Sequence, residues 1–261
     1  MKKILSLAAL SVILFSSCKK TTEVVGEFEG KATVSFDSKV GTSDFALGTD
    51  FTIGTKTYNF SRLRYWISNV SLVDNKGVEY AIPNSYYLLE EVGNITLTEL
   101  SDPITYPARK REDVTVSNIP VGDYKTIKFS IGVDSKYNNN MSLQAGELSQ
   151  YSGMTNVSWM WLTSYIFTNL QGTVKEGTTT KTFKAETGLN ANYKSVSLDL
   201  PKAVRISTAK PTSIKLNLDV TKILDGIDLI ATPNIGASQA TVMATLAGNY
   251  ATKAVTVTSA E

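Results

Sequence analysis

The chain has 261 residues, of which 42% are hydrophobic and 19% are charged, and this composition is sufficient for a buried core. The 26 basic and 24 acidic residues nearly cancel, so the sequence predicts no nucleic-acid partner. There is no histidine and only one cysteine. These counts exclude histidine-based acid–base catalysis, Ser-His and Cys-His nucleophile pairs, and ordinary His/Cys zinc sites, and we expect a protein that is not an enzyme.

The N-terminal segment is typical of a bacterial export signal. A basic start at residues 1–3 precedes an almost wholly apolar run at 4–15, which is too short to span a bilayer as a helix. Two serines then precede Cys18, the single cysteine, and this arrangement resembles a lipobox. It implies cleavage before Cys18 and diacylglycerol on its sulfur, which would anchor the protein in a membrane. We expect residues 1–17 to be a lipoprotein signal peptide, 18–26 a tether, and the exported protein to be an outer-membrane lipoprotein that faces the periplasm or the cell surface. The alternative is a plain secretory signal with an incidental cysteine.

From residue 27 onwards, the dominant pattern is the alternation of apolar and polar residues that indicates β-strands with one buried face. Alternating runs occur at 32–36, 63–67, 114–116, 127–133, 196–200 and 214–220. A change of phase at Ser68 and Asn69 predicts a β-bulge, and the turn sequences at 74–77 and 175–178 predict hairpins.

Helix patterns are rare and lie near the C-terminus. Residues 221–227 could form one or two turns, and Ser238 is a candidate N-cap for a helix that runs to about Gly248. Many short strands with frequent turns are typical of a β-sandwich or an open barrel, and neither a linker nor a fixed-period repeat interrupts them. We therefore predict an all-β fold, with one antiparallel β-sandwich domain over residues 27–261 and one or two short helices near the C-terminus.

Four segments, in order, resemble the MbnP-like family of exported copper-binding proteins. They lie at 36–41, 63–72, 119–134 and 159–172, and the most specific are LRYWISNVSL at 63–72 and WMWLTSYIF at 159–167. The resemblance implies an envelope lipoprotein with a β-sandwich binding domain and copper as the cofactor, held in the family by histidines and an oxidised tryptophan.

By position in the family's motifs, the resemblance implies metal-binding positions at Ser38, Trp159, Trp161 and Glu186. Ser38 lies in the opening strand, and Glu186 stands where the family has a histidine two residues before a glycine. Because this chain has no imidazole, and because a carboxylate is a harder ligand that disfavours Cu(I), we expect weak or absent copper binding.

Other residues offer alternatives from different classes. The thioethers of Met141, Met154, Met160 and Met243 are soft copper donors but equally suit a core, and the oxygens of residues 134–140 suit either Ca²⁺ or a polar loop. A set of aromatic residues could stack on a glycan or fill the core: Tyr65, Trp66, Tyr86, Tyr87, Tyr151 and Tyr165. The run at 109–111 is basic, and we expect an exposed loop there. A surface carbohydrate- or protein-binding module without a metal is therefore the alternative function, with the partner left open.

Replacing Cys18 by Ser tests whether the protein carries the expected lipid anchor on that residue. Without the sulfur that carries the lipid, the Cys18→Ser protein should be soluble in the periplasm or remain unprocessed in the membrane. Cell fractionation and mass spectrometry of the mature N-terminus check this. A Cys18→Ser protein that is still cleaved before residue 18 and acylated would contradict the lipobox interpretation.

Overall fold

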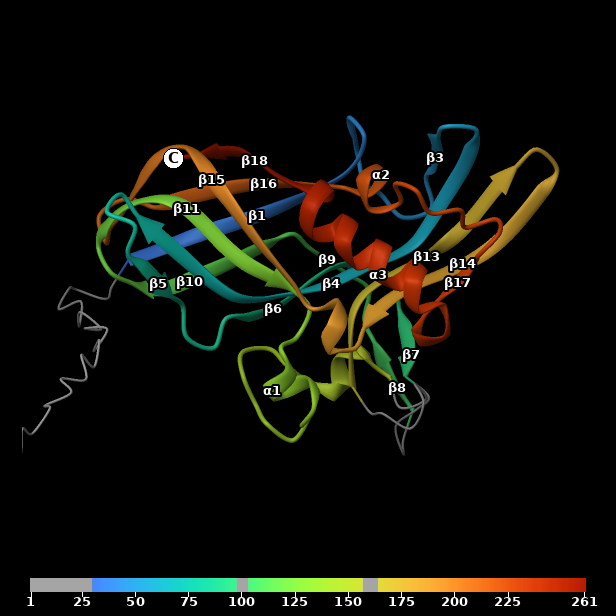
Figure 1. Ribbon diagram of the computed structural model, residues 1–261, viewed down its shortest axis with the longest axis horizontal. Coiled ribbons are helices and arrows are strands. Elements are labelled where there is room, and N and C mark those ends of the chain that lie inside the picture. The colour runs from blue at the N-terminus through green and yellow to red at the C-terminus, as the bar shows by residue number, and fades with distance from the viewer. Residues whose placement is uncertain (1–29, 98–102, 157–163) are drawn as a thin grey trace, which may run out of the picture.

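The computed structural model describes residues 30–97, 103–156 and 164–261. Its strands form two sheets that pack face to face (Figure 1). The smaller sheet has the order β10-β1-β16-β18, with β2 paired to β1. Its strands are β1 (Gly30–Val40), β2 (Ser43–Asp44), β10 (Asp113–Ile119), β16 (Thr212–Asp219) and β18 (Val255–Ala260).

The larger sheet has the order β15-β11-β4-β13-β14-β17. These strands are β4 (Lys56–Asp74), β11 (Gly122–Ile131), β13 (Ser164–Glu176), β14 (Thr179–Gly188), β15 (Lys194–Ile206) and β17 (Asn234–Ile235). Shorter strands extend this sheet: β3 (Asp50–Ile53), β5 (Glu79–Ala81), β6 (Tyr86–Val92), β9 (Arg109–Arg111) and β12 (Thr155–Asn156). A separate hairpin consists of β7 (Ile95–Leu97) and β8 (Ile104–Tyr106).

The 19-residue strand β4 is central to the larger sheet, because several other strands pair along its two edges. One of its edges pairs first with β13 and then with β11, and the other pairs with β3, β6 and β5. The predicted bulge is confirmed, because the β4–β11 register shifts between Ser68 and Ser71 and Asn69 has a φ of 51°. Gly172 of β13 passes so close to β4 that a Cβ there would lie 2.2 Å from the carbonyl oxygen of Asn59.

The core lies between the two sheets. Buried and less buried residues alternate along β1, and its buried side chains face the larger sheet. The Phe36 ring on β1 lies 5.3 Å from the Phe129 ring and 6.5 Å from the Tyr65 ring, centroid to centroid. Each fully buried side chain of this size stabilises the fold by about 1.5–3 kcal/mol. The alternation in the sequence therefore corresponds to the apolar interior of a sandwich.

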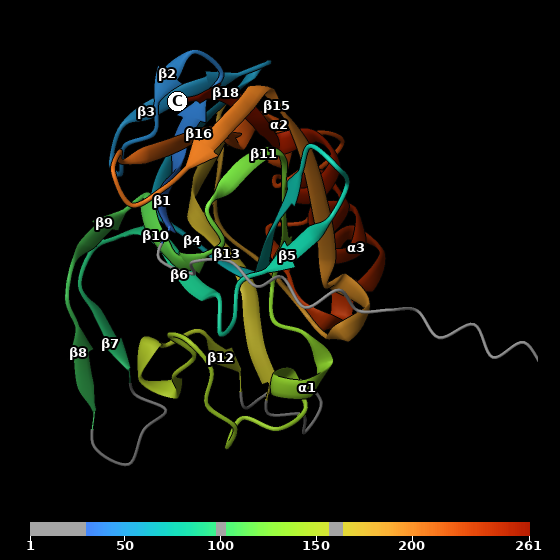
Figure 2. The same cartoon turned by 90° about the vertical axis from the view of Figure 1, so that its left-hand side faces the viewer.

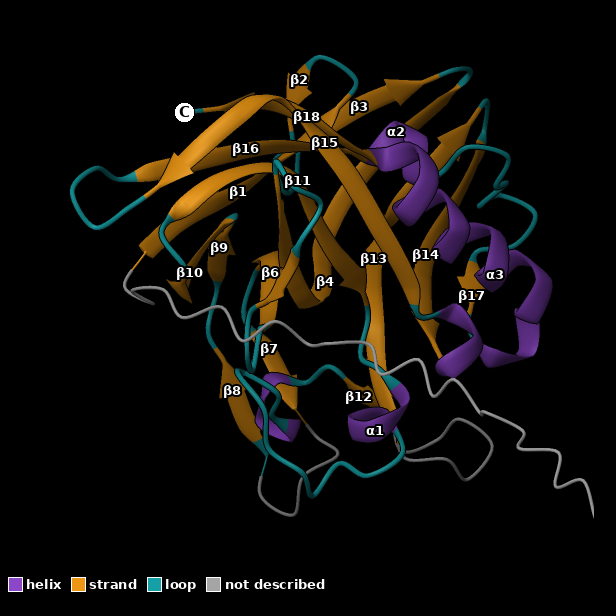
Figure 3. Ribbon diagram, turned by 60° about the vertical axis from the view of Figure 1, so that its left-hand side comes forward, coloured by secondary structure: helices purple, strands orange, loops and turns teal. Residues whose placement is uncertain are grey.

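Helices are few and short (Figure 3). They are α1 (Ser135–Asn138), α2 (Val220–Ile223) and α3 (Ala240–Asn249), with 3-10 turns at 150–152, 190–192 and 237–239 and a π-helical turn at 250–254. Helix α3 lies against β14 and β17. Helix α1, β7 and β8 lie together at one end of the molecule (Figure 2). Within the residues described, no helix combines the length and the apolar character that crossing a bilayer requires.

The all-β sandwich with short C-terminal helices is confirmed, with differences in detail. Strand β1 pairs in parallel with β16. The long connection between them, which includes β10 and every strand of the larger sheet except β17, makes this parallel pairing possible. Ser238 does not cap the C-terminal helix, since it lies within a 3-10 turn and α3 begins at Ala240. The polar segment after Asp134 contains α1, and the Asp134 carboxylate caps that helix.

The basic run Arg109–Arg111 is a strand rather than a loop. It forms β9, which pairs with β6, and this pairing brings each cation close to a carboxylate. Arg109 lies 3.5 Å from Glu90, Lys110 lies 2.9 Å from Glu91, and Arg111 donates to Glu147 over 2.8 Å. The acidic residues that pair with these three cations are on other elements, so the local sequence could not reveal the ion pairs.

Candidate binding cavity

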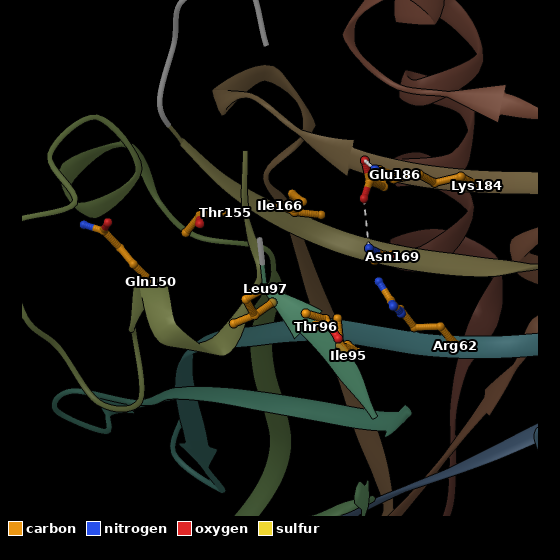
Figure 4. Close-up of a pocket in the computed structure, with 11 residues that line it drawn as sticks. Arg62, Ile95, Thr96, Leu97, Gln150, Thr155, Ile166, Asn169, Lys184 and Glu186 are labelled. Carbon is orange, nitrogen blue, oxygen red and sulfur yellow. Dashed lines mark hydrogen bonds and ion pairs between the residues drawn. The ribbon is translucent and has the colours of Figure 1, made fainter. Parts of the chain in front are cut away.

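A small cavity of about 170 Å³ lies on the larger sheet, at the end of the molecule that carries β7 and β8 (Figure 4). Its lining comes from three parts of the chain. Strands β4, β13 and β14 supply Arg62, Ile166, Asn169, Lys184 and Glu186, strand β7 supplies Ile95, Thr96 and Leu97, and the segment from η1 (Gln150–Ser152) to β12 supplies Gln150, Gly153 and Thr155. Residues from 62 to 186 thus come together around one cavity.

Cross-strand register shows that the cavity is on the outer face of this sheet. Glu186 lies opposite Asn169, and Asn169 lies opposite Arg64, so these three side chains project to the same face. The next residues in register, Thr187, Thr168 and Tyr65, project to the other face, where Tyr65 meets Phe36 of the smaller sheet. The sheet therefore has an apolar inner face and a polar outer face beneath the cavity.

A buried carboxylate and a buried amide form the floor of the cavity. Asn169 Nδ2 donates to Glu186 Oε1 over 2.8 Å, and Lys184 Nζ lies 3.1 Å from Glu186 Oε2. Asn169 is 2% exposed and Glu186 is 3% exposed. Asn169 Oδ1 accepts no hydrogen bond from any residue that the structure describes. A buried acceptor left in this state costs about 1–3 kcal/mol, so it is open to a donor from a bound molecule.

Arg62 brings to the same cavity a positive charge that no described residue pairs with. Its side chain is half-buried, and it makes no hydrogen bond or ion pair with any of the described residues. Burial lowers the pKa of the guanidinium below its ordinary value and the neighbouring Arg64 acts in the same direction, whereas Glu186 opposes them. The group nevertheless remains a cation, because an arginine side chain is not deprotonated in proteins.

A buried ion pair holds the walls of the cavity in place. Arg64 Nε donates to Glu90 Oε2 over 2.7 Å, and neither side chain is exposed to solvent. Arg64 Nη2 donates to the Ser152 carbonyl oxygen over 2.7 Å, and Tyr106 donates to Glu90 Oε1 over 2.6 Å. Burial, followed by this bond to Glu90, raises the pKa of the Tyr106 hydroxyl. The pair therefore ties β8 and the 150–152 turn to β4 and β6.

The structure does not bring Ser38 and Glu186 together. Ser38 is 4% exposed on β1, its backbone N–H donates to Glu112 Oε1 over 2.9 Å, and its side chain is on the inner face with Phe36. Glu186, by contrast, projects from the outer face of the larger sheet. Trp159, Trp161 and Cys18 lie outside the described residues. The cavity-lining residues Thr155 and Ile166 belong to β12 and β13, which flank the tryptophan segment in the sequence.

Most of the other candidate residues are part of the core. Met141, Met154 and Met243 are buried, and Met243 Sδ accepts a hydrogen bond from Asn192 Nδ2 over 2.9 Å. Met160 lies outside the described residues. Of the aromatic set, Tyr65, Trp66, Tyr86 and Tyr165 are buried, Tyr87 is half-buried, and Tyr151 is 67% exposed. Among the residues the structure describes, no three His, Cys, Asp or Glu side chains are grouped so as to hold a metal ion.

Sequence reasoning missed Arg62 and Asn169. Both are polar residues at the outward positions of strands whose inward positions are apolar, and exposed strand faces carry such residues routinely. Only the covering of this face by β7 and by residues 150–155 makes them cavity residues.

Comparison with known proteins places the chain in a family. The family model described as MbnP matches residues 29–244. The chain belongs to the MbnP family. The resemblance found in the sequence is thus confirmed. Among solved structures, MbnP from Methylosinus trichosporium is similar, with 18% sequence identity, coverage of 76% of this chain and 78% of that chain, and a TM-score of 0.48. No curated protein matches this MbnP-family chain.

Replacing Arg64 by Met should lower the free energy of unfolding by about 3–5 kcal/mol, because Glu90 would be left as a buried charge without its main partner. Adding Glu90→Leu to that variant should recover part of the loss, since the uncompensated charge is then removed. Urea-induced unfolding measures both effects. The control is Lys128→Met, which breaks the exposed pair with Glu79 and should cost less than about 1 kcal/mol. Equal costs for Arg64→Met and Lys128→Met would show that the buried pair does not hold this end of the fold.

Proposed function

We propose that the protein is an exported envelope lipoprotein whose MbnP domain binds a small molecule in the cavity and releases it unchanged. The observation that supports this most is a buried oxygen of Asn169 beside the guanidinium of Arg62, neither of which has a partner among the described residues. Both groups lower the stability of the folded protein unless something binds there, because a buried acceptor and a partly desolvated cation are each unfavourable alone. The signal-like segment at 1–17 and Cys18 support export and lipid anchorage.

Binding without catalysis is the better-supported role. Both oxygens of the Glu186 carboxylate are held by Asn169 and Lys184. A general acid or base needs a proton that it can exchange with a substrate, and an arginine supplies none near neutral pH. The cavity therefore offers charge and hydrogen-bonding groups for recognition.

The groups present do not fit copper held by nitrogen or sulfur ligands. The chain has no histidine, and Glu186 offers only hard oxygen donors that a lysine and an amide already engage. Ser38 would have to reach through the larger sheet to share an ion with Glu186. Ser38 projects from the smaller sheet into the core, whereas Glu186 projects from the outer face of the larger sheet. We therefore propose that copper is not the ligand of this domain.

The glycan alternative has less support. Stacking on a sugar needs exposed ring faces, and of the six aromatic residues considered for it only Tyr151 is largely exposed. The four buried rings belong to the core instead. The cavity thus remains the best candidate for a ligand site.

Equilibrium dialysis of the purified protein against a bacterial small-molecule extract tests the binding role. Mass spectrometry of the protein compartment should show one enriched solute whose mass is unchanged after prolonged incubation. Thr96→Trp should abolish the enrichment by filling the cavity from the exposed strand β7. Thr256→Trp, at an exposed position of β18 in the smaller sheet, should not. Retention of no solute, or conversion of the solute to a product, would overturn the proposal.

A copper competition experiment tests the proposal that copper is not the ligand of this domain. The protein, loaded with Cu(I) and dialysed against a competing chelator, should retain far less than one copper per chain. The variant with both Ser38→His and Glu186→His should bind Cu(I) no more tightly than Glu186→His alone, because one imidazole would lie in the core between the sheets and the other on the outer face of the larger sheet. Stoichiometric copper in the unaltered protein, or a large gain specific to the double variant, would contradict this expectation.

A further inference from the structure

The charges around the cavity leave one cation unmatched. Lys184 is neutralised by Glu186, whose carboxylate lies 3.1 Å from its ammonium group. Behind them, Arg64 is paired with Glu90. Arg62 has no ion pair with any residue that the structure describes, although it lines the cavity. Counted over the described residues, the site thus carries a surplus of one positive charge, which a ligand with a single negative charge would balance.

The hydrogen-bonding groups add a second requirement. Asn169 Nδ2 is committed to Glu186, so Asn169 presents its Oδ1, an acceptor, without a partner among the described residues. A ligand must therefore offer an O–H or N–H group to this oxygen. The apolar side chains of Ile95, Leu97 and Ile166 line the same space and suit a short carbon skeleton between the two polar ends.

Three features narrow the chemical class of the ligand that the cavity could bind. The planar guanidinium fork matches a carboxylate in geometry. A phosphate would bring nearly two negative charges, and the second would face Glu186 with no free cation to meet it. An ammonium donor would place a positive charge next to Arg62 and Lys184, whereas a hydroxyl donor adds no charge.

We propose that the cavity binds a small hydroxycarboxylate of about three to six carbons, with its carboxylate on Arg62 and its hydroxyl group donating to Asn169 Oδ1. The size follows from the cavity volume of about 170 Å³. This proposal rests on the proposed binding function and names the ligand class for the same cavity.

Arginine-selective ¹⁵N labelling gives a direct readout of ligand binding at Arg62, because the chain contains only five arginines and their NMR signals can be told apart. In the full-length protein, the Nε–Hε signal of Arg62 is identified by its absence from the Arg62→Gln variant. L-lactate and D-gluconate serve as probes, and at least one should shift this signal to saturation. Propionate lacks the hydroxyl group, propane-1,2-diol lacks the carboxylate, and L-alanine carries an ammonium group. Each should require at least about tenfold more ligand for the same shift, which corresponds to the loss of one well-formed polar contact.

Variants separate a specific site from general anion attraction. Arg62→Gln should abolish binding of the hydroxycarboxylate, measured by saturation-transfer signals of the ligand, and Arg62→Lys should retain part of it. Arg205→Gln is the matched control, since Arg205 is exposed and pairs with Asp123 away from the cavity. Thermal unfolding without ligand verifies that each variant is folded.

The outcomes are distinct. No shift with either hydroxycarboxylate, equal shifts with propionate or alanine, or equal effects of Arg62→Gln and Arg205→Gln would each overturn the proposed ligand class. If the extract dialysis still yields a solute whose binding Thr96→Trp abolishes, the binding function stands and only the ligand class is wrong. If that dialysis also yields nothing, the binding function itself fails.

Discussion

The buried pair of Arg64 and Glu90 is the interaction on which the polar end of this molecule depends. Removing two charges from water is expensive, and the cost is recovered only where further hydrogen bonds satisfy them. Here Tyr106 and the Ser152 carbonyl oxygen supply two such bonds, one to each member of the pair. Since these partners come from β8 and the 150–152 turn, satisfying the pair also docks both segments over the outer face of the larger sheet. The cavity exists because that docking covers a face which would otherwise be open to solvent.

Strand β4 shows how one segment serves both the core and the site. Leu63 and Tyr65 project into the apolar interior, whereas Arg62 and Arg64 project to the outer face. The same register places Asn169 and Glu186 on the outer face, in line with Arg64 across β13 and β14. The rigid inner face thus fixes the positions of polar groups outside it. A site built on paired strands in this way is more precisely positioned than one built on loops.

Membership in the MbnP family does not by itself specify the ligand. Family membership describes the scaffold, while binding depends on the side chains that line a site. In this chain those side chains are a guanidinium, an amide, an ammonium group and a carboxylate, held within one cavity. Their charges and hydrogen-bonding groups suit a small polar solute better than a soft metal ion.

By itself, the sequence determined the all-β class, the bulge at Asn69, the 74–77 and 175–178 turns, the short C-terminal helices and the family, because period-two alternation and turn residues are local signals. It also marked Glu186 by its place in a motif. Only the tertiary structure decided that Ser38 faces the core while Glu186 lies on the outer face of the larger sheet, that Arg109–Arg111 forms a strand, and that Arg62 and Asn169 share a cavity. Each of these depends on which distant strands pair and which face another segment covers. Pairing and coverage are set by long-range packing, which no local pattern along the chain encodes.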